Sequence, residues 1–167
     1  MNILAGNFCS LLAMLSDSFS SSRKTARGVL LVQLLSQFFY ASSSLFLKGY
    51  SAVVQNVISV ARNIAAIRKV ENKLLEWVLI VLGVVLGLYF NNLGWVGWLP
   101  VIANLEYTLT VFHYKDNEYA LKIAFLLNAV LFTIFNAFIL NFIGVIGNII
   151  IIISTAVFLI KDRKNRE

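Results

Sequence analysis

Charge and reactive side chains are scarce in this sequence of 167 residues. Only 13% of the residues are charged, whereas soluble domains carry about 25%. A single cysteine, Cys9, forms no internal disulfide, and a single histidine, His113, excludes a multi-histidine metal site. The sequence also lacks a phosphate-binding glycine loop and a recognisable set of nucleophile, base and orienting group. We therefore expect neither an enzyme nor a protein that holds a metal or a cofactor.

Apolar residues make up most of the chain. They account for 59% of the sequence, and the mean hydropathy is +0.81. A transmembrane helix needs about 20 mainly apolar residues, and the chain contains seven such segments. Lipid admits only helices and closed barrels, and the alternating pattern of barrel strands is absent. The sequence predicts an all-α membrane protein with seven transmembrane helices, over roughly 2–19, 28–47, 50–67, 74–90, 94–112, 119–139 and 142–160.

Basic residues are distributed unevenly between the predicted loops. Twelve of the fourteen lysines and arginines lie after the first, third and fifth segments, or within one turn of those loops, or in the C-terminal tail. The opposite loops hold only Lys48, and Arg62 lies within a segment. Cytoplasmic loops are enriched in basic residues, so we expect the N-terminus outside and the C-terminus in the cytoplasm. This distribution also explains the net charge of +6 without a nucleic-acid partner.

The two ends of the chain resemble each other. At an offset of 92 positions, Tyr40 falls on Phe132 and Asn56 on Asn148, and the predicted loops coincide without gaps. This pattern predicts two parallel three-helix bundles joined by a linker helix, a 3+1+3 arrangement. The expected divisions are 1–69 for the first bundle, 70–93 for the linker helix, 94–161 for the second bundle and 162–167 for the tail. Parallel repeats build some transporters, whose site lies near the midplane between them.

Polar side chains recur at helical spacing within the predicted spans. One interpretation is that they form hydrogen bonds between helices. The other is that they line a hydrated pathway. For the repeat-related pair Asn56 and Asn148 we favour the pathway, because amides both donate and accept and suit a neutral ligand rich in hydroxyls or amides. The candidate substrate-binding residues are Asn56, Asn148, Gln33, Gln37, Tyr40, Ser59, Asn63, Asn128 and Phe132.

Two charged residues lie deep within the predicted spans. Intramembrane ionisable groups are costly and usually mark a functional site or a buried pair. Arg62 and Glu106 lie at similar depths in the third and fifth segments, so a charge pair that acts as a gate is one hypothesis. The alternative is that Arg62 extends to the cytoplasmic surface while Glu106 is protonated or bonded to a hydroxyl.

The predicted architecture resembles that of SWEET and PQ-loop proteins. Three stretches are more specific: Ser21-Ser22-Arg23-Lys24, residues 33–49 and the stretch NVISVARN at 56–63. In these stretches the sequence resembles the bacterial YgjV-type inner-membrane family, a relative of that group. The resemblance implies a bacterial inner-membrane location, and Asn56 and Asn148 fall where SWEET proteins carry pocket asparagines. The chain departs from that group in having one proline, Pro100, and in carrying Tyr40 and Phe132 where pocket tryptophans are expected.

Together, the repeat, the polar faces and the resemblance predict a transporter or facilitator of a small polar solute such as a sugar, nucleoside or vitamin. Alternating access at the repeat interface is the expected mechanism, with the lipid bilayer as its surroundings and a homo-oligomer possible. The alternative is a membrane-embedded scaffold, receptor or accessory subunit. The two differ in one observable property: a transporter should have a cavity lined by the second, third, sixth and seventh helices, and a scaffold should pack these faces dry.

Overall fold

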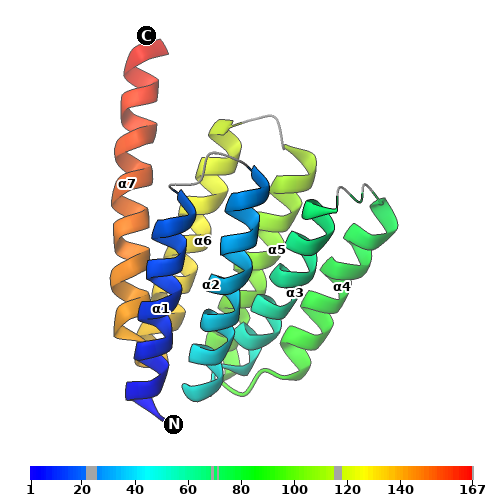
Figure 1. Ribbon diagram of the computed structural model, residues 1–167, viewed down its shortest axis with the longest axis vertical. Coiled ribbons are helices and arrows are strands. Elements are labelled where there is room, and N and C mark those ends of the chain that lie inside the picture. Colours follow the sequence, from blue (N-terminus) through cyan, green and yellow to red (C-terminus); the bar gives the residue numbers. More distant parts are fainter. Residues whose placement is uncertain (22–25, 69, 71, 115–117, 167) are drawn as a thin grey trace.

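The computed structural model describes residues 1–21, 26–68, 70, 72–114 and 118–166 (Figure 1). These residues form seven α-helices and one short 3₁₀-helix, and every predicted apolar segment is helical. The basic loop residues Arg23, Lys24, Lys69 and Lys115 lie outside the described residues, as does the predicted boundary at residue 69. The elements are α1 Ile3–Ser21, α2 Ala26–Phe46, α3 Tyr50–Ile67, α4 Lys73–Tyr89, η1 Gly94–Gly97, α5 Trp98–His113, α6 Glu118–Phe138 and α7 Phe142–Arg166.

The helices differ in how well they match the thickness of a bilayer. Among the described residues, only Phe142–Ile160 of α7 is both long and apolar enough to qualify as a membrane span, and Ile3–Phe19 and Lys122–Phe138 are apolar but shorter. α5 has 16 residues because its expected first turn is the 3₁₀-helix Gly94–Gly97, which starts at a positive φ of 59° on Gly94. Sixteen residues rise about 24 Å as an α-helix.

Helices that follow one another in sequence pack side by side. Two further contacts join helices that are not neighbours in sequence: α1 packs on α7, and α3 packs on α5. α4 packs only on α3 and α5 among the larger contacts and stands at the edge of the bundle in Figure 1. The long α7 extends beyond its neighbours at the end where the C-terminus lies. α4 therefore covers the seam between α3 and α5 from outside.

The corner between α2 and α3 has the same backbone geometry as the corner between α6 and α7. Lys48 and Leu140, which are 92 positions apart, have φ values of 61° and 59°. Each corner closes with the same two backbone hydrogen bonds. In the first corner Gly49 N donates to Ser44 O at 2.8 Å and Lys48 N to Leu45 O at 3.2 Å. In the second, Asn141 N donates to Asn136 O at 2.9 Å and Leu140 N to Ala137 O at 3.3 Å. This is a Schellman motif, in which a left-handed residue satisfies the last carbonyls of a helix. The predicted repeat thus coincides with a repeated backbone geometry.

Each of these corners is bound by an asparagine from a distant part of the chain, the α4–η1 connection in one case and α1 in the other. Asn92, just before η1, donates from Nδ2 to Lys48 O at 2.7 Å and accepts from Tyr50 N at 3.4 Å. Asn7 of α1 donates to Leu140 O at 2.9 Å and accepts from Ile143 N at 3.0 Å. We call these two sets of bonds the asparagine clamps. They join distant parts of the chain at one end of the bundle, the end that the distribution of basic residues predicts to lie outside.

A compact apolar core lies beneath the clamps. Phe135 of α6 is fully buried and packs with Leu47, Ala52, Val96 and Ile139. Its ring occupies the space beside Gly49, where a Cβ atom would lie 2.8 Å from Phe135 Cζ. This core therefore seals the same end of the bundle that the clamps hold.

Removing a clamp should weaken the protein modestly. We expect Asn92→Ala and Asn7→Ala each to lower the free energy of unfolding by about 1 kcal/mol, because each substitution breaks a side-chain bond to a corner carbonyl. The measurement is unfolding of the purified protein in mixed micelles. Ser42→Ala is the matched control, since Ser42 bonds only to Phe38 O of its own helix. Equal stability of all three variants would contradict a clamping role.

Candidate solute site

The site begins where α4 approaches α3 closely. Gly83 and Gly87 are buried on the face of α4 that meets α3, in the small-xxx-small spacing visible in the sequence. Gln55 of α3 lies against them, 2% exposed, and donates from Nε2 to Gly83 O at 2.8 Å. Because these two glycines have no side chains, the buried Gln55 can reach the backbone of α4.

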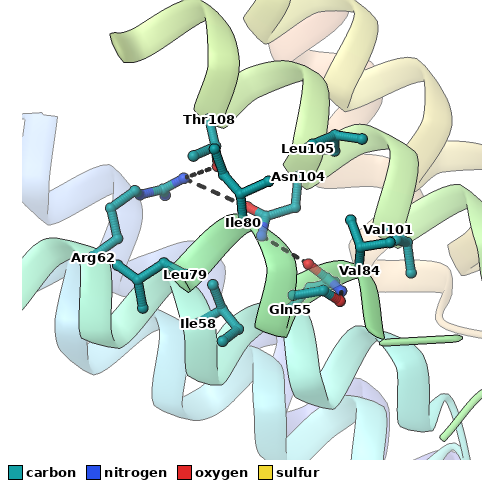
Figure 2. Close-up of a pocket in the computed structure, with 11 residues that line it drawn as sticks. Gln55, Ile58, Arg62, Leu79, Ile80, Val84, Val101, Asn104, Leu105 and Thr108 are labelled. Atoms are coloured by element: carbon teal, nitrogen blue, oxygen red, sulfur yellow. Dashed lines mark hydrogen bonds between the residues drawn. The ribbon is translucent and has the colours of Figure 1, made fainter. Parts of the chain in front are cut away.

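Asn104 of α5 links this glutamine to the rest of the site. Its Nδ2 donates to Gln55 Oε1 at 2.7 Å. Its Oδ1 accepts from Arg62 Nη1 at 3.4 Å (Figure 2). The same Oδ1 accepts from Ser59 Oγ at 3.4 Å. One buried amide therefore uses both its donor and its acceptor to connect α3 of the first repeat with α5 of the second.

Arg62 is the charged member of the site. Nη1 also donates to Thr108 Oγ1 at 3.1 Å, and the guanidinium carbon lies 5.5 Å from the centre of the Tyr107 ring, within range of a cation–π contact. Both hydrogen bonds leave from Nη1, and within the described part of the chain Nη2 and Nε have no hydrogen-bond partner. The guanidinium is thus held at one end while its other donors stay available.

A small cavity lies among these groups. Its volume is about 10 Å³, roughly the space one water molecule needs. Gln55, Arg62, Asn104 and Thr108 supply its polar lining, and apolar side chains of α3, α4 and α5 supply the rest. None of the described residues that line it is acidic. This cavity lies among α3, α4 and α5, and not among the second, third, sixth and seventh helices where the sequence predicted one.

The two intramembrane charges have different partners. Arg62 bonds to neutral side chains, whereas Glu106 Oε1 accepts from Thr110 at 3.4 Å. Glu106 Oε2 is buried and has no hydrogen-bond partner in the structure. Among the described residues the hypothesised direct ion pair is therefore not formed. The physical reason lies in the phase of α5: Asn104 and Thr108 are buried, whereas Glu106 shares a face with the exposed Ile102.

The structure brings only part of the predicted site together. Ser59 and Arg62 belong to the cavity network, while Asn56 and Asn63 are buried on α3 outside the cavity lining. Asn148 on α7 is half-buried and does not line the cavity either. That Asn56 and Asn148 share a cavity stays a prediction.

Other predicted residues have structural partners. Asn128 donates to Ala103 O at 3.0 Å and so joins α6 to α5. Phe132 packs on the apolar core, with its ring 6.3 Å from that of Phe135. Gln33 and Gln37 are half-buried on α2. Tyr40, also on α2, hydrogen-bonds to Asp17 of α1, an acid that the sequence reasoning did not single out.

Sequence reasoning also missed the importance of Gln55, Asn104 and Thr108. All three stood out as polar residues within apolar spans. The signal that separates them from the rest is the Gly83–Gly87 pair, which marks the face of α4 that must approach another helix. A polar residue opposite such a face is the one expected to reach backbone carbonyls.

Comparison with known proteins places the chain in a family. Residues 4–166 match Imp-YgjV, described as a bacterial inner membrane protein. The chain belongs to this family. No curated protein and no solved structure matches the chain. The family match covers nearly the whole length of this YgjV-family protein. The description of the family places it in the lipid of the bacterial inner membrane.

Proposed function

We propose that this YgjV-family protein carries a small polar solute across the bacterial inner membrane. The observation that supports the proposal best is the polar network of Gln55, Ser59, Arg62, Asn104 and Thr108, which spans the two sequence repeats. Arg62 lies 12 residues after the start and 5 residues before the end of α3, which is about 18 Å and about 7.5 Å along the helix, so it lies inside the predicted span, nearer its inner end. Polar groups at such depth are expensive unless they serve a pathway or a partner.

The proposal includes a mechanism of alternating access. The helices act as two parallel bundles, α1–α3 and α5–α7, with α4 as the linker that gives both bundles the same orientation. The asparagine clamps and the Phe135 core close the outer end, and the network lies further in. Rocking one bundle against the other would break the clamp bonds and open a path to the network from outside. The repeated corners favour this division, because each corner is a rigid unit within one bundle.

The orientation of the helices is tested by cysteine labelling. In a Cys9→Ser background, we expect Lys48→Cys to react with an impermeant reagent from outside, and Val70→Cys to react only after permeabilisation. Both positions are exposed, and they lie at opposite ends of α3. Labelling of both positions from one side would contradict seven crossings with the N-terminus outside.

Transport itself is tested in proteoliposomes. We expect saturable uptake of one or more solutes from a panel of sugars, nucleosides and small carboxylic acids, with uptake strongly reduced in Asn104→Leu, because this change removes the amide that joins the network. Asn128→Leu is the matched control, since this asparagine also bonds between helices but lies outside the cavity. Uptake that is equal in both variants, or equal to that of empty liposomes, would contradict the proposal.

One observation favours a second candidate, a receptor or accessory subunit that binds another membrane protein. Glu106 lies on the same face of α5 as the exposed Ile102, and among the described residues its buried Oε2 has no hydrogen-bond partner, so the carboxyl group would have to turn outward to meet a partner. A partner helix with a donor at this depth would satisfy it. Under this candidate Glu106→Gln would disrupt co-purification of that partner, whereas under the transport proposal it leaves uptake intact.

A further inference from the structure

The charge of Arg62 has no counterpart within its site. A guanidinium is always protonated in proteins, and an unpaired charge away from water is strongly penalised. Every side chain that bonds to Arg62 in the described structure is neutral, and no acid lines the cavity. The carboxyl group of Glu106, the residue before Tyr107 on α5, accepts a hydrogen bond from Thr110 instead. The site thus carries a net positive charge at depth.

The neutral partners orient the guanidinium and leave its charge uncompensated. Asn104 Oδ1 and Thr108 Oγ1 both bond to Nη1, at 3.4 and 3.1 Å. Tyr107 lies against the guanidinium at 5.5 Å and restricts its rotation. Nη2 and Nε, the edge with which arginine binds carboxylates in a bidentate manner, have no hydrogen-bond partner among the described residues. Two hydrogen bonds and one ring contact therefore preorganise a free binding edge.

We propose that the solute carries an anionic group and that Arg62 binds this group. This inference rests on the proposed function, and it names the chemical class of the solute. Planar carboxylates match the geometry of the free edge. A neutral sugar or nucleoside would leave the charge of Arg62 unpaired in its binding site.

The small, partly open cavity of about 10 Å³ limits what can bind beside Arg62. It holds a group about the size of one water molecule, so for a larger acid we expect α4 to move away from α3 and α5. Gln55 is the link that would break, because its bond to Gly83 O ties α4 to the network. An anion thus binds either as a very small species or with displacement of α4.

The test compares acids with their uncharged amides. Formate, acetate and lactate are each paired with formamide, acetamide and lactamide, at equal ionic strength, and thermal unfolding of the purified full-length protein is followed. We expect each acid that fits to raise Tm in a concentration-dependent manner, by about 5 °C at 100-fold excess over Kd. The amides should produce no rise, because they lack the charge.

Three variants attribute the effect to Arg62. Arg62→Gln should abolish the rise in Tm. Asn104→Asp places a carboxylate beside Nη1 within an almost unchanged shape, so it should also abolish the rise while keeping cooperative unfolding, even if Arg62→Gln fails to fold. Arg68→Gln is the matched control, because it removes an exposed arginine beyond the end of α3 and should respond like the wild type.

The outcomes separate this inference from the transport proposal. Stabilisation by acids that depends on Arg62, without uptake of the same radiolabelled acid into proteoliposomes, would support the anion site and contradict transport. Uptake of a neutral solute, with no stabilisation by any of the three acids, would overturn the anion site and leave transport standing. A rise in Tm that is equal for acids and amides, or unchanged in Arg62→Gln and Asn104→Asp, would also overturn the inference.

Discussion

Phe135→Ala is expected to lower the free energy of unfolding by about 3 kcal/mol, the lower end of the range for truncating a buried phenylalanine. The ring is fully buried between α6 and the α2–α3 corner, and it packs on Leu47 and Ile139. In a membrane the hydrophobic term is small, so the loss arises mainly from van der Waals contacts that no lipid chain can replace inside the core. The measurement is equilibrium unfolding in mixed micelles by titration with a denaturing detergent.

Phe142→Ala serves as the control for this substitution. Phe142 is 58% exposed at the start of α7, so its truncation should cost well under half as much. The Phe135 variant should also make Lys48→Cys react faster with impermeant reagent, because the core supports the corner that carries Lys48. Equal losses for Phe135→Ala and Phe142→Ala would show that the apolar core does not hold this end of the bundle.

Gly87→Ala is expected to destabilise the protein by about 2 kcal/mol, as overpacking of a tight interface does. A Cβ atom at Gly87 would overlap Gln55 Nε2 and would lie 2.7 Å from Val101 Cγ2. Either α4 moves outward or Gln55 loses its place, and both changes break the bond to Gly83 O. The substitution should therefore weaken both the fold and ligand binding at Arg62, measured by unfolding and by the shift in Tm with acids.

Gly83→Ala is the matched control, one helical turn earlier on the same face of α4. There the nearest atom to a new Cβ is Gln55 Oε1 at 3.5 Å, an ordinary van der Waals distance. Alanine also favours helix over glycine by up to about 1 kcal/mol, so this variant should be as stable as the wild type or more so. If Gly83→Ala were the more damaging of the two, α4 would not pack as the structure describes.

The helix boundaries and the repeat could be predicted from the sequence, because both depend on local patterns. Apolar segments of sufficient length fix the helices, and the offset of 92 carries Lys48 onto Leu140, where the two corners have the same backbone geometry. The asparagine clamps were not predictable. Asn7 and Leu140 are 133 positions apart, and nothing in the local sequence of either residue indicates the other.

The site was predicted only in part, because α3 carries polar residues on two adjacent flanks. Asn56 and Gln55 are neighbours in sequence, both buried, and equally plausible as members of a binding site. Which of them faces a neighbouring helix depends on how α3 rotates against α4 and α5, and that rotation is set by packing at Gly83 and Gly87. The repeat symmetry favoured Asn56, whereas close packing placed Gln55 beside the cavity.

The asparagine clamps have a consequence for synthesis of the protein on the ribosome. Asn7 leaves the ribosome early, but its partner Leu140 follows 133 residues later, a delay of about 7–27 s at 5–20 residues per second. The α2–α3 corner likewise waits for Asn92, which follows Lys48 by 44 residues. The α2–α3 corner is thus complete as soon as Asn92 is in place. Asn7 of the first helix, in contrast, stays without its long-range partners until the corner between the last two helices has been made.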